Sequence, residues 1–297
     1  MTKNLFLLGL MVCSMAMTGQ TQKKDSWYFK LGLGGSYFIQ AAATEFPNVD
    51  GREPLKQVYV GGKLVSKESI TGSFGEGFRT GLGLGHRFTD RLGMEMGINY
   101  YTSNSKTMVQ TISDNVTVLQ SKGQVKAFDL APALVLYLGE IKRFEPYTKV
   151  GVIVPVEGKL EIKTNAISNG AVVYRKDIIK PNATVGFLAA LGTSYKVAKN
   201  VSAYGEIEYR NFTVHGKDKE VTAYTYNGTD RLALPEGHPL YVSNSERYTN
   251  YSDHLDTNSN SNVTNSSNFD STKPTDDLSS YISISGVGLT LGLRYSL

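Results

Sequence analysis

Cysteine is almost absent from this sequence of 297 residues, where Cys13 is the single example. One cysteine excludes a disulfide framework and a zinc site built from cysteines. The 31 basic and 27 acidic side chains leave a net charge of +4, too small for the dense basic patch of a nucleic-acid binder. We therefore expect no nucleic-acid partner, and no residue pattern indicates a cofactor, a metal site or a catalytic residue.

Long hydrophobic runs are also missing, apart from one near the start. The apolar stretch from Leu5 to Met17 follows a basic residue and precedes small and polar residues, which is typical of a secretory signal peptide. We assign residues 1–20 to the signal peptide and residues 21–297 to one mature domain, and a lipoprotein anchor at Cys13 is the alternative. Since the rest of the chain has no run near the ~18 apolar residues of a transmembrane helix, any membrane insertion must use strands.

Glycine and aromatic residues are plentiful instead, with 30 Gly, 18 Tyr and 12 Phe. Apolar residues alternate with polar or small ones in eight stretches, each long enough for the ~9–11 residues of a tilted transmembrane strand. Pro132 and Pro155 interrupt two stretches, and a local bulge is expected at each. The stretches are residues 27–39, 77–88, 92–100, 127–138, 149–163, 184–197, 201–210 and 286–295.

The connections between these stretches alternate in length. Short ones lie around Asp90, at 139–146 and around Lys199. An even strand number with short turns at one end and long loops at the other is typical of bacterial outer-membrane barrels. The fold prediction is all-β: an eight-stranded antiparallel up-and-down transmembrane β-barrel with periplasmic termini and four long extracellular loops, at residues 40–75, 102–122, 165–182 and 213–279.

The two faces of the stretches differ in kind. One face is mostly Gly, Ala and Ser with scattered charges, which suits a narrow lumen, and we predict a lumen charge network there: Lys30, Arg79, Arg87, Glu95, Asp129, Lys149, Lys196, Glu206, Glu208, Arg210 and Arg294. The other face is an apolar band, and its flanking aromatic residues predict two membrane girdles: Trp27, Phe29, Tyr37, Phe88, Tyr100, Tyr195, Tyr209 and Tyr295. A secreted lipocalin-like carrier, with the apolar face inward, is the alternative arrangement.

Three segments carry a family resemblance: Phe88–Leu92, Tyr204–Tyr209 and the ending Gly288–Tyr295, together with repeated Gly-x-Gly strands. They resemble the outer-membrane β-barrel family, of the eight-stranded kind related to the barrel of outer-membrane protein A. The resemblance covers nearly the whole mature chain and implies a bacterial outer-membrane location in contact with lipid. It also implies that the barrel-assembly machinery reads the C-terminal strand.

The sequence has few residue patterns that point to catalysis or ligand binding, and the function prediction follows from that. Charges of both signs in a narrow lumen are expected to pair and plug it, which favours a non-enzymatic structural or surface-interaction protein. A narrow ion or small-solute channel through the same residues is the alternative. His215, His238 and His254 lie in the last long segment, rich in Ser and Asp, without the spacing of a catalytic triad. That Asn/Ser-rich segment, 213–279, is expected to be a mobile surface loop that offers a partner-binding surface.

Overall fold

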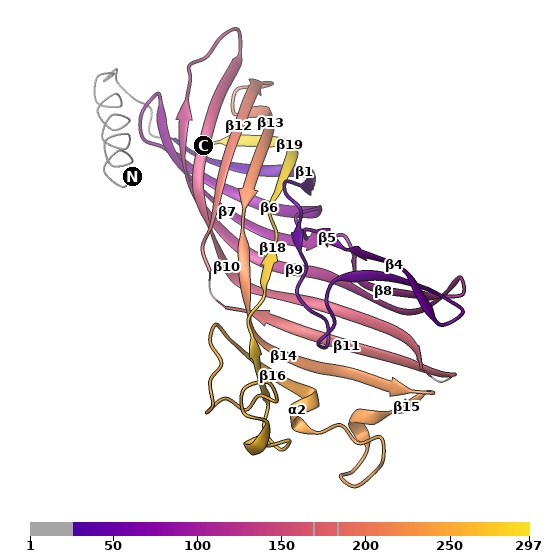
Figure 1. The fold of residues 1–297 in the computed structure, drawn as a ribbon. Helices are drawn as coiled ribbons and strands as arrows, with labels where there is room; N and C mark the ends of the chain where they lie inside the picture. Colours follow the sequence, from indigo (N-terminus) through magenta and orange to yellow (C-terminus); the bar gives the residue numbers. More distant parts are fainter. Residues whose placement is uncertain (1–25, 169, 183) are drawn as a thin grey trace, which may run out of the picture.

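The computed structural model describes residues 26–168, 170–182 and 184–297, so the predicted signal peptide and Cys13 lie outside the described residues. Its main body is a closed barrel, visible in the upper part of Figure 1. Neighbouring strands pair antiparallel, and β1 pairs with both β6 and β19 to complete the closure. In order around the barrel, the eight strands are β1 (Ser26–Gln40), β6 (Gly77–Arg87), β7 (Leu92–Ser103), β9 (Val116–Tyr137), β10 (Phe144–Ser168), β12 (Gly186–Lys196), β13 (Val201–Asn211) and β19 (Gly286–Ser296).

The alternation predicted from the sequence is present within the barrel on all eight strands, and the prediction of a closed, eight-stranded antiparallel barrel is confirmed. The large apolar side chains point outward, as Leu191 with 69% and Leu82 with 60% exposure illustrate. Charged and small residues fill the inside. This arrangement contradicts the lipocalin-like alternative, which needs the apolar face inside. Among the described residues, helices are too short to cross a membrane.

Strand β10 has a β-bulge where the sequence predicts one, but the prediction did not include its effect on which residues face inward. Its register against β9 shifts between Pro155 and Glu157, which is the predicted bulge. The extra residue reverses the inside–outside parity, so Leu160 and Ile162 are buried instead of sharing the outer face with Val150. At Pro132 the expected bulge is wrong, because β9 keeps its register with β7 there.

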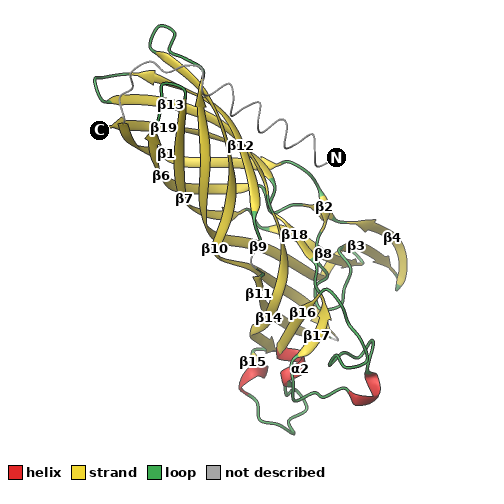
Figure 2. Ribbon diagram, turned by 90° about the vertical axis from the view of Figure 1, so that its left-hand side faces the viewer, coloured by secondary structure: helices red, strands yellow, loops and turns green. Residues whose placement is uncertain are grey.

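The predicted loops 102–122 and 165–182 are mostly strand, and 40–75 and 213–279 contain several strands, which corrects the loop boundaries. Strands β9 and β10 run far past the barrel, and further strands join them to form an open sheet that we call the extension (Figures 1 and 2). On one side of β9 it continues through β8, the parallel β3 and the outermost β4. On the other side of β10 it continues through β11, β14, β16 and β17. Their bounds are β3 (Leu55–Val60), β4 (Lys63–Ser69), β8 (Lys106–Ser113), β11 (Ala171–Pro181), β14 (Thr213–Tyr226), β16 (Tyr248–Ser252) and β17 (Thr275–Leu278).

Tight turns explain why these segments are hairpins rather than loops. The pairs Gly61-Gly62, Asp114-Asn115 and Asn227-Gly228 all have positive φ at both residues. Such pairs form the two-residue turns whose twist matches antiparallel strands, and Gly, Asn and Asp tolerate this backbone best. They join β3 to β4, β8 to β9, and β14 to the short β15 (Thr229–Asp230).

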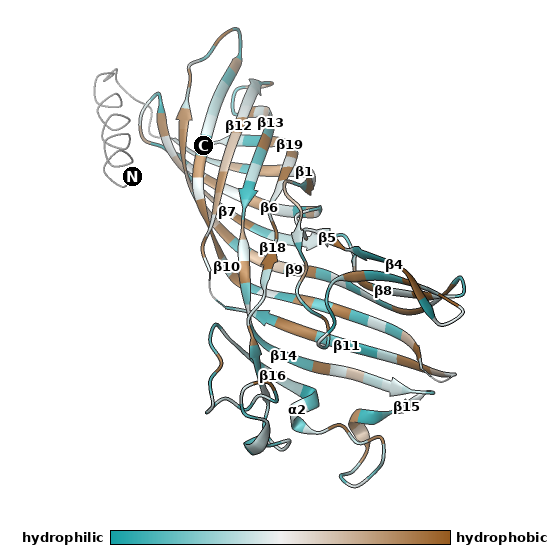
Figure 3. Ribbon diagram, in the orientation of Figure 1, coloured by the Kyte–Doolittle hydropathy of each residue, from teal (hydrophilic) through white to brown (hydrophobic). Residues whose placement is uncertain are grey.

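The segment 213–279 is not one continuous loop. Beyond β14 it contains three short helices, η1 (Arg231–Ala233), α2 (Asn244–Arg247) and η2 (Ser266–Asn268). The short strand β18 (Tyr281–Ser283) follows just after the segment ends. The Asn/Ser-rich stretch follows a defined path because Asn260 bonds to the Asp270 and Pro274 carbonyls and to the Asp276 carboxylate. Side-chain amides thus replace an apolar core here, and Figure 3 shows how hydrophilic this part of the chain is beside the barrel.

An apolar cluster fills the region where the barrel meets the extension. Phe46 and Phe74, from the chain on either side of β3 and β4, have ring centroids 5.1 Å apart. They come from near the two-stranded ladder of β2 (Thr44–Glu45) and β5 (Thr71–Gly72). The cluster closes this end of the barrel with the following buried residues: Met108, Val109, Val125, Ile153, Leu160, Ile162, Ile179, Leu188, Phe212, Val214 and Ile282.

Candidate functional site: the barrel lumen

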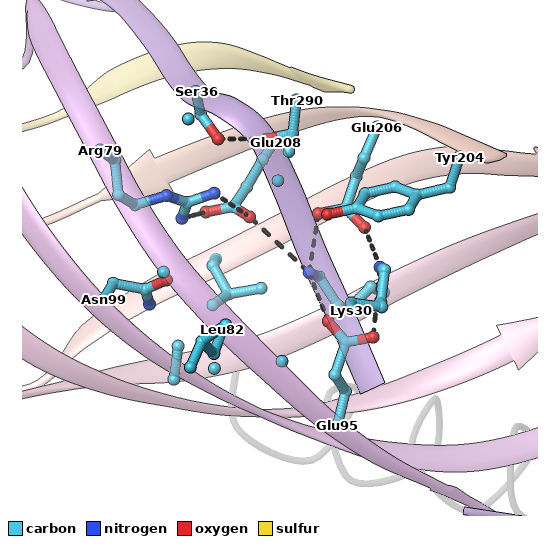
Figure 4. Close-up of a pocket in the computed structure, with 18 residues that line it drawn as sticks. Lys30, Ser36, Arg79, Leu82, Glu95, Asn99, Tyr204, Glu206, Glu208 and Thr290 are labelled. Atoms are coloured by element: carbon cyan, nitrogen blue, oxygen red, sulfur yellow. Dashed lines mark hydrogen bonds and ion pairs between the residues drawn. The ribbon is translucent and has the colours of Figure 1, made fainter. Parts of the chain in front are cut away.

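Four charged side chains of alternating sign meet across the lumen. Lys30 Nζ lies 2.9 Å from Glu206 and 3.2 Å from Glu95, and Lys149 Nζ lies 2.7 Å from Glu206 and 3.1 Å from Glu95. We call these four residues the central ring. Figure 4 shows Lys30, Glu95 and Glu206 converging inside the barrel.

The geometry of an eight-stranded barrel produces this ring. Its members stand on β1, β7, β10 and β13, which are alternate strands around the barrel. Alternate strands contribute side chains at the same level, so four of them meet across a lumen just wide enough to be filled. Every charge has two partners of opposite sign, and all four side chains are nearly fully buried. Full pairing offsets the desolvation that makes a lone buried charge cost several kcal/mol.

Tyrosine hydroxyls supply the remaining hydrogen bonds of the ring. Tyr147 donates to Glu206 at 2.9 Å, and Tyr28 donates to Glu95 at 3.2 Å. Tyr137 donates in turn to the Tyr28 hydroxyl at 3.1 Å. The Lys30 ammonium also lies 4.4 Å from the ring centroid of Tyr204. These tyrosine side chains fix the carboxylates in place and fill the lumen between the central ring and the short turns.

A second group of ion pairs lies on the extension side of the central ring. Arg79 forms two hydrogen bonds with Glu208, at 2.5 and 3.2 Å. Arg210 Nη2 lies 2.8 Å from Asp129, which also accepts from Asn99 at 2.9 Å. Hydrogen bonds between guanidinium and carboxylate groups in this geometry are strong and directional, so they hold these side chains across the lumen.

A third group stands near the short turns and includes a residue that the sequence reading missed. Glu145 accepts from Arg87 at 2.6 Å and from Arg294 at 3.0 Å. The predicted connection at 139–146 includes Glu145, but β10 already begins at Phe144. Counting back in steps of two from Lys149 puts Tyr147 and Glu145 on the lumen face, so the parity rule would have found both.

Ten of the eleven predicted lumen charges take part in these ion pairs, and Lys196 does not. Lys196 is the last residue of β12 and is exposed there. It forms none of the ion pairs found among residues 26–168, 170–182 and 184–297. The alternation puts Lys196 on the same face of β12 as the lumen residues, but the end of the strand lies beyond the lumen.

The glycines of the inner face make room for the tyrosine rings. A methyl group added at Gly85 would come within 2.0 Å of the Tyr28 ring, and one at Gly192 within 2.4 Å of the Tyr147 ring. At Gly292 the nearest ring atom belongs to Tyr204. The Gly-rich face in the sequence is therefore the surface on which inward aromatic side chains lie flat.

The predicted girdle residues all point outward from the barrel. Trp27 packs against His86 with ring centroids 4.6 Å apart, and His86 packs against Phe88 at 5.0 Å. Phe29 pairs with Tyr295 across β1 and β19 near the short turns. The exposed aromatic set comprises Trp27, Phe29, Tyr37, Phe88, Tyr100, Tyr195, Tyr209 and Tyr295.

Little open space remains inside the lumen. A cavity of about 50 Å³ lies between the central ring and the Arg79 group. A cavity of about 150 Å³ is needed to bind one benzene molecule, so this smaller space suits water rather than a solute of that size. On the far side, the apolar cluster follows. The arrangement can hold charge and water in place.

The histidines stand apart from the lumen. His215 Nδ1 lies 3.5 Å from Asp253, and its ring packs on Tyr281 at 4.2 Å. His238 Nδ1 accepts from the Leu240 amide. Within the described part of the chain, no group of three or more His, Cys, Asp or Glu could hold a metal ion.

Comparisons with known proteins agree with this architecture. The chain matches the family model for the outer membrane protein beta-barrel domain over residues 5–230. It is similar to the outer membrane protein OprG from Pseudomonas aeruginosa, with 11% identity, a TM-score of 0.45, and coverage of 93% of this chain and 97% of that one. It is also similar to the E. coli outer membrane protein W, with 10% identity, a TM-score of 0.31, and coverage of 93% and 100%. No curated protein matches it significantly. The chain belongs to the outer-membrane β-barrel domain family and is embedded in the lipid of a bacterial outer membrane.

Proposed function

We propose that this is a non-enzymatic surface-interaction protein whose barrel is a closed anchor and whose extension is the working part. The observation that carries the proposal is the central ring, in which charges from four alternate strands pair across the whole lumen. The apolar cluster is a second barrier at the other end. An ion crossing the barrel would have to break buried ion pairs and then enter an apolar region.

The first test is conductance of the purified protein in planar lipid bilayers. We expect no discrete openings from the native chain. The double variant Lys149→Ala/Glu206→Ala removes half of the central ring, and Glu157→Ala/Lys159→Ala is its matched control, because it removes the same two residue types from exposed positions on β10. Discrete openings of the native protein contradict a closed lumen, whether or not the lumen variant changes them.

One observation favours the second candidate, a narrow channel for ions or small solutes. The cavity of about 50 Å³ is lined by charges of both signs, including Lys30, Arg79 and Glu206. Native openings whose size changes in Lys149→Ala/Glu206→Ala, but not in the control, would identify this lumen as the path.

The orientation belongs to the same proposal: termini and short turns face the periplasm, and the extension stands outside the cell. It is supported by the difference in length between the two ends, because outer-membrane barrels have short periplasmic turns. The same picture includes removal of residues 1–20 as a signal peptide and recognition of the C-terminal strand by the barrel-assembly machinery. The girdle aromatics would then lie at the two lipid–water interfaces.

Cysteine labelling tests the orientation. Ser66 on β4 belongs to the extension, Lys142 lies in the short turn between β9 and β10, and both are exposed. We expect a membrane-impermeant maleimide to label Ser66→Cys on intact cells and to label Lys142→Cys only after the outer membrane is opened. Labelling of Lys142→Cys alone on intact cells would reverse the orientation.

A further inference from the structure

A cleft in the extension has the composition of a small-molecule site. It has a volume of about 170 Å³, larger than the lumen cavity, and lies where the turn at Asp50 meets β11, β14, β16 and β17. An engineered apolar cavity of about 150 Å³ binds one benzene molecule, so the cleft has room for a single six-membered ring. Its floor is apolar, because Ile179 and Ile282 are buried there.

The cleft is rigidly built. Asp50 and Gly51 both have positive φ, the geometry of a two-residue turn. Arg175 Nη1 holds the turn by an ion pair of 2.6 Å to Asp50, and its Nε binds Asp177 at 2.9 Å. The ring of Tyr251 forms another wall, close against the backbone of Gly216.

Polar groups without partners line this cleft. Lys219 pairs with Ile179 in the β11–β14 register, which sets its side chain beside the apolar floor. Within the ranges that the structure describes, no carboxylate lies within 4.0 Å of its ammonium, and the Tyr251 hydroxyl has no hydrogen-bond partner. Burial, together with nearby Arg175, lowers the pKa of Lys219, and burial raises the pKa of Tyr251. Both residues are only partly buried, so within the described part of the chain these two polar groups face the open space of the cleft, where a ligand can reach them.

The charges around the cleft identify the class of ligand. Arg52, Arg175 and Lys219 balance Asp50, Asp177 and Asp277, so the surroundings favour a neutral molecule. Lys219 can donate hydrogen bonds, and Asp277, on the exposed rim, can accept them. A ligand must therefore offer both acceptors and donors around its edge and an apolar face toward the floor. Hydroxyl groups around a pyranose ring, whose C–H groups form its faces, meet all three conditions.

We propose that this cleft binds one neutral sugar residue, with Lys219 and Asp277 bonding its hydroxyl groups and Ile179 and Ile282 beneath its ring. The inference rests on the proposed surface role, since it gives the extension a ligand. The measurement below uses purified protein in detergent, where orientation and conductance play no part. Its failure would therefore leave the closed lumen and the orientation untouched.

The experiment titrates the full-length protein with the methyl glycosides of glucose, galactose, mannose and N-acetylglucosamine, followed by ligand-observed NMR. We expect at least one to bind with a Kd of about 1 mM, and Lys219→Met to weaken it about tenfold. The matched control Lys217→Met changes an exposed lysine two residues away on the same strand, and we expect it to bind as the native protein does. Asp277→Asn, on the exposed rim, provides a second test that does not alter the buried floor.

Three outcomes would overturn the proposal. One is that none of the four glycosides binds. Another is that Lys219→Met, shown to be folded by heat-dependent gel mobility, and Asp277→Asn both bind as tightly as the native protein. The third is that glycine or another zwitterion binds in the cleft while the glycosides do not, because this would assign the site to a charged ligand.

Discussion

Leu291→Arg is expected to prevent stable insertion of the barrel. Leu291 is the middle residue of β19 and is 58% exposed on the outer face. An arginine at the bilayer midplane of an outer-membrane barrel costs roughly 2–4 kcal/mol. We expect the free energy of unfolding from lipid vesicles, measured by urea titration, to fall by that amount. The unboiled, fast-migrating band on gels should weaken in parallel.

The control is Val65→Arg, a similar change at an exposed apolar position of the extension, and it should leave stability unchanged. The inner face of β19 gives a contrasting result. A methyl group at Gly288 would already lie within 2.5 Å of the Phe38 ring, so Gly288→Leu and Gly288→Arg should both fail by crowding. Normal insertion of Leu291→Arg would show that the outer face of β19 does not contact lipid.

Glu206→Gln should be the most damaging conservative change inside the lumen. The carboxylate accepts from Lys30, Lys149 and Tyr147 at 2.7 to 2.9 Å. Without its charge, the two buried ammonium groups share Glu95, and Lys149 keeps only a longer contact of 3.7 Å to Glu208. Removing one partner from a buried ion pair costs about 3–5 kcal/mol, and we expect a loss of that order in the free energy of unfolding.

The double variant Glu206→Met/Lys149→Met separates a charge effect from a packing effect. It leaves Lys30 paired with Glu95 and restores neutrality, so we expect it to be more stable than Glu206→Gln. Glu157→Gln, at an exposed position of β10, is the control for the chemical change and should cost nothing measurable. If the double variant loses as much as its two single changes together, charge pairing does not organise the lumen.

The barrel strands were predictable because a barrel imposes one strong rule, the alternation of faces. All eight strands obey it within the barrel, and β10 departs from it only beyond the bulge after Pro155. Lys30, Glu95, Lys149 and Glu206 were placed in the lumen by parity alone. The partners within the lumen were not predictable, because they depend on which strands stand opposite each other at the same level. Lys196 shows the limit of the rule, since parity says nothing about where the barrel ends.

The extension escaped prediction for a different reason. The outermost strand, β4, is exposed at all seven residues and so lacks the apolar alternation that marks a lipid-facing strand. The informative signals were the pairs Gly61-Gly62, Asp114-Asn115 and Asn227-Gly228, which specify hairpins. The cleft around Lys219 was beyond reach, because it unites residues from five separate segments.

The continuous path of β10 from barrel to extension decides how far the extension reaches. β10 leaves β12 after Ile153 and runs on to Ser168, a further 15 residues. At about 3.3 Å per residue these cover roughly 50 Å of strand, whereas a flexible chain of that length spans about 20 Å on average. The paired β9 holds this segment straight along most of its length. A molecule that docks on the extension therefore meets it at a fixed distance from the barrel rim, and little chain entropy is lost when it binds.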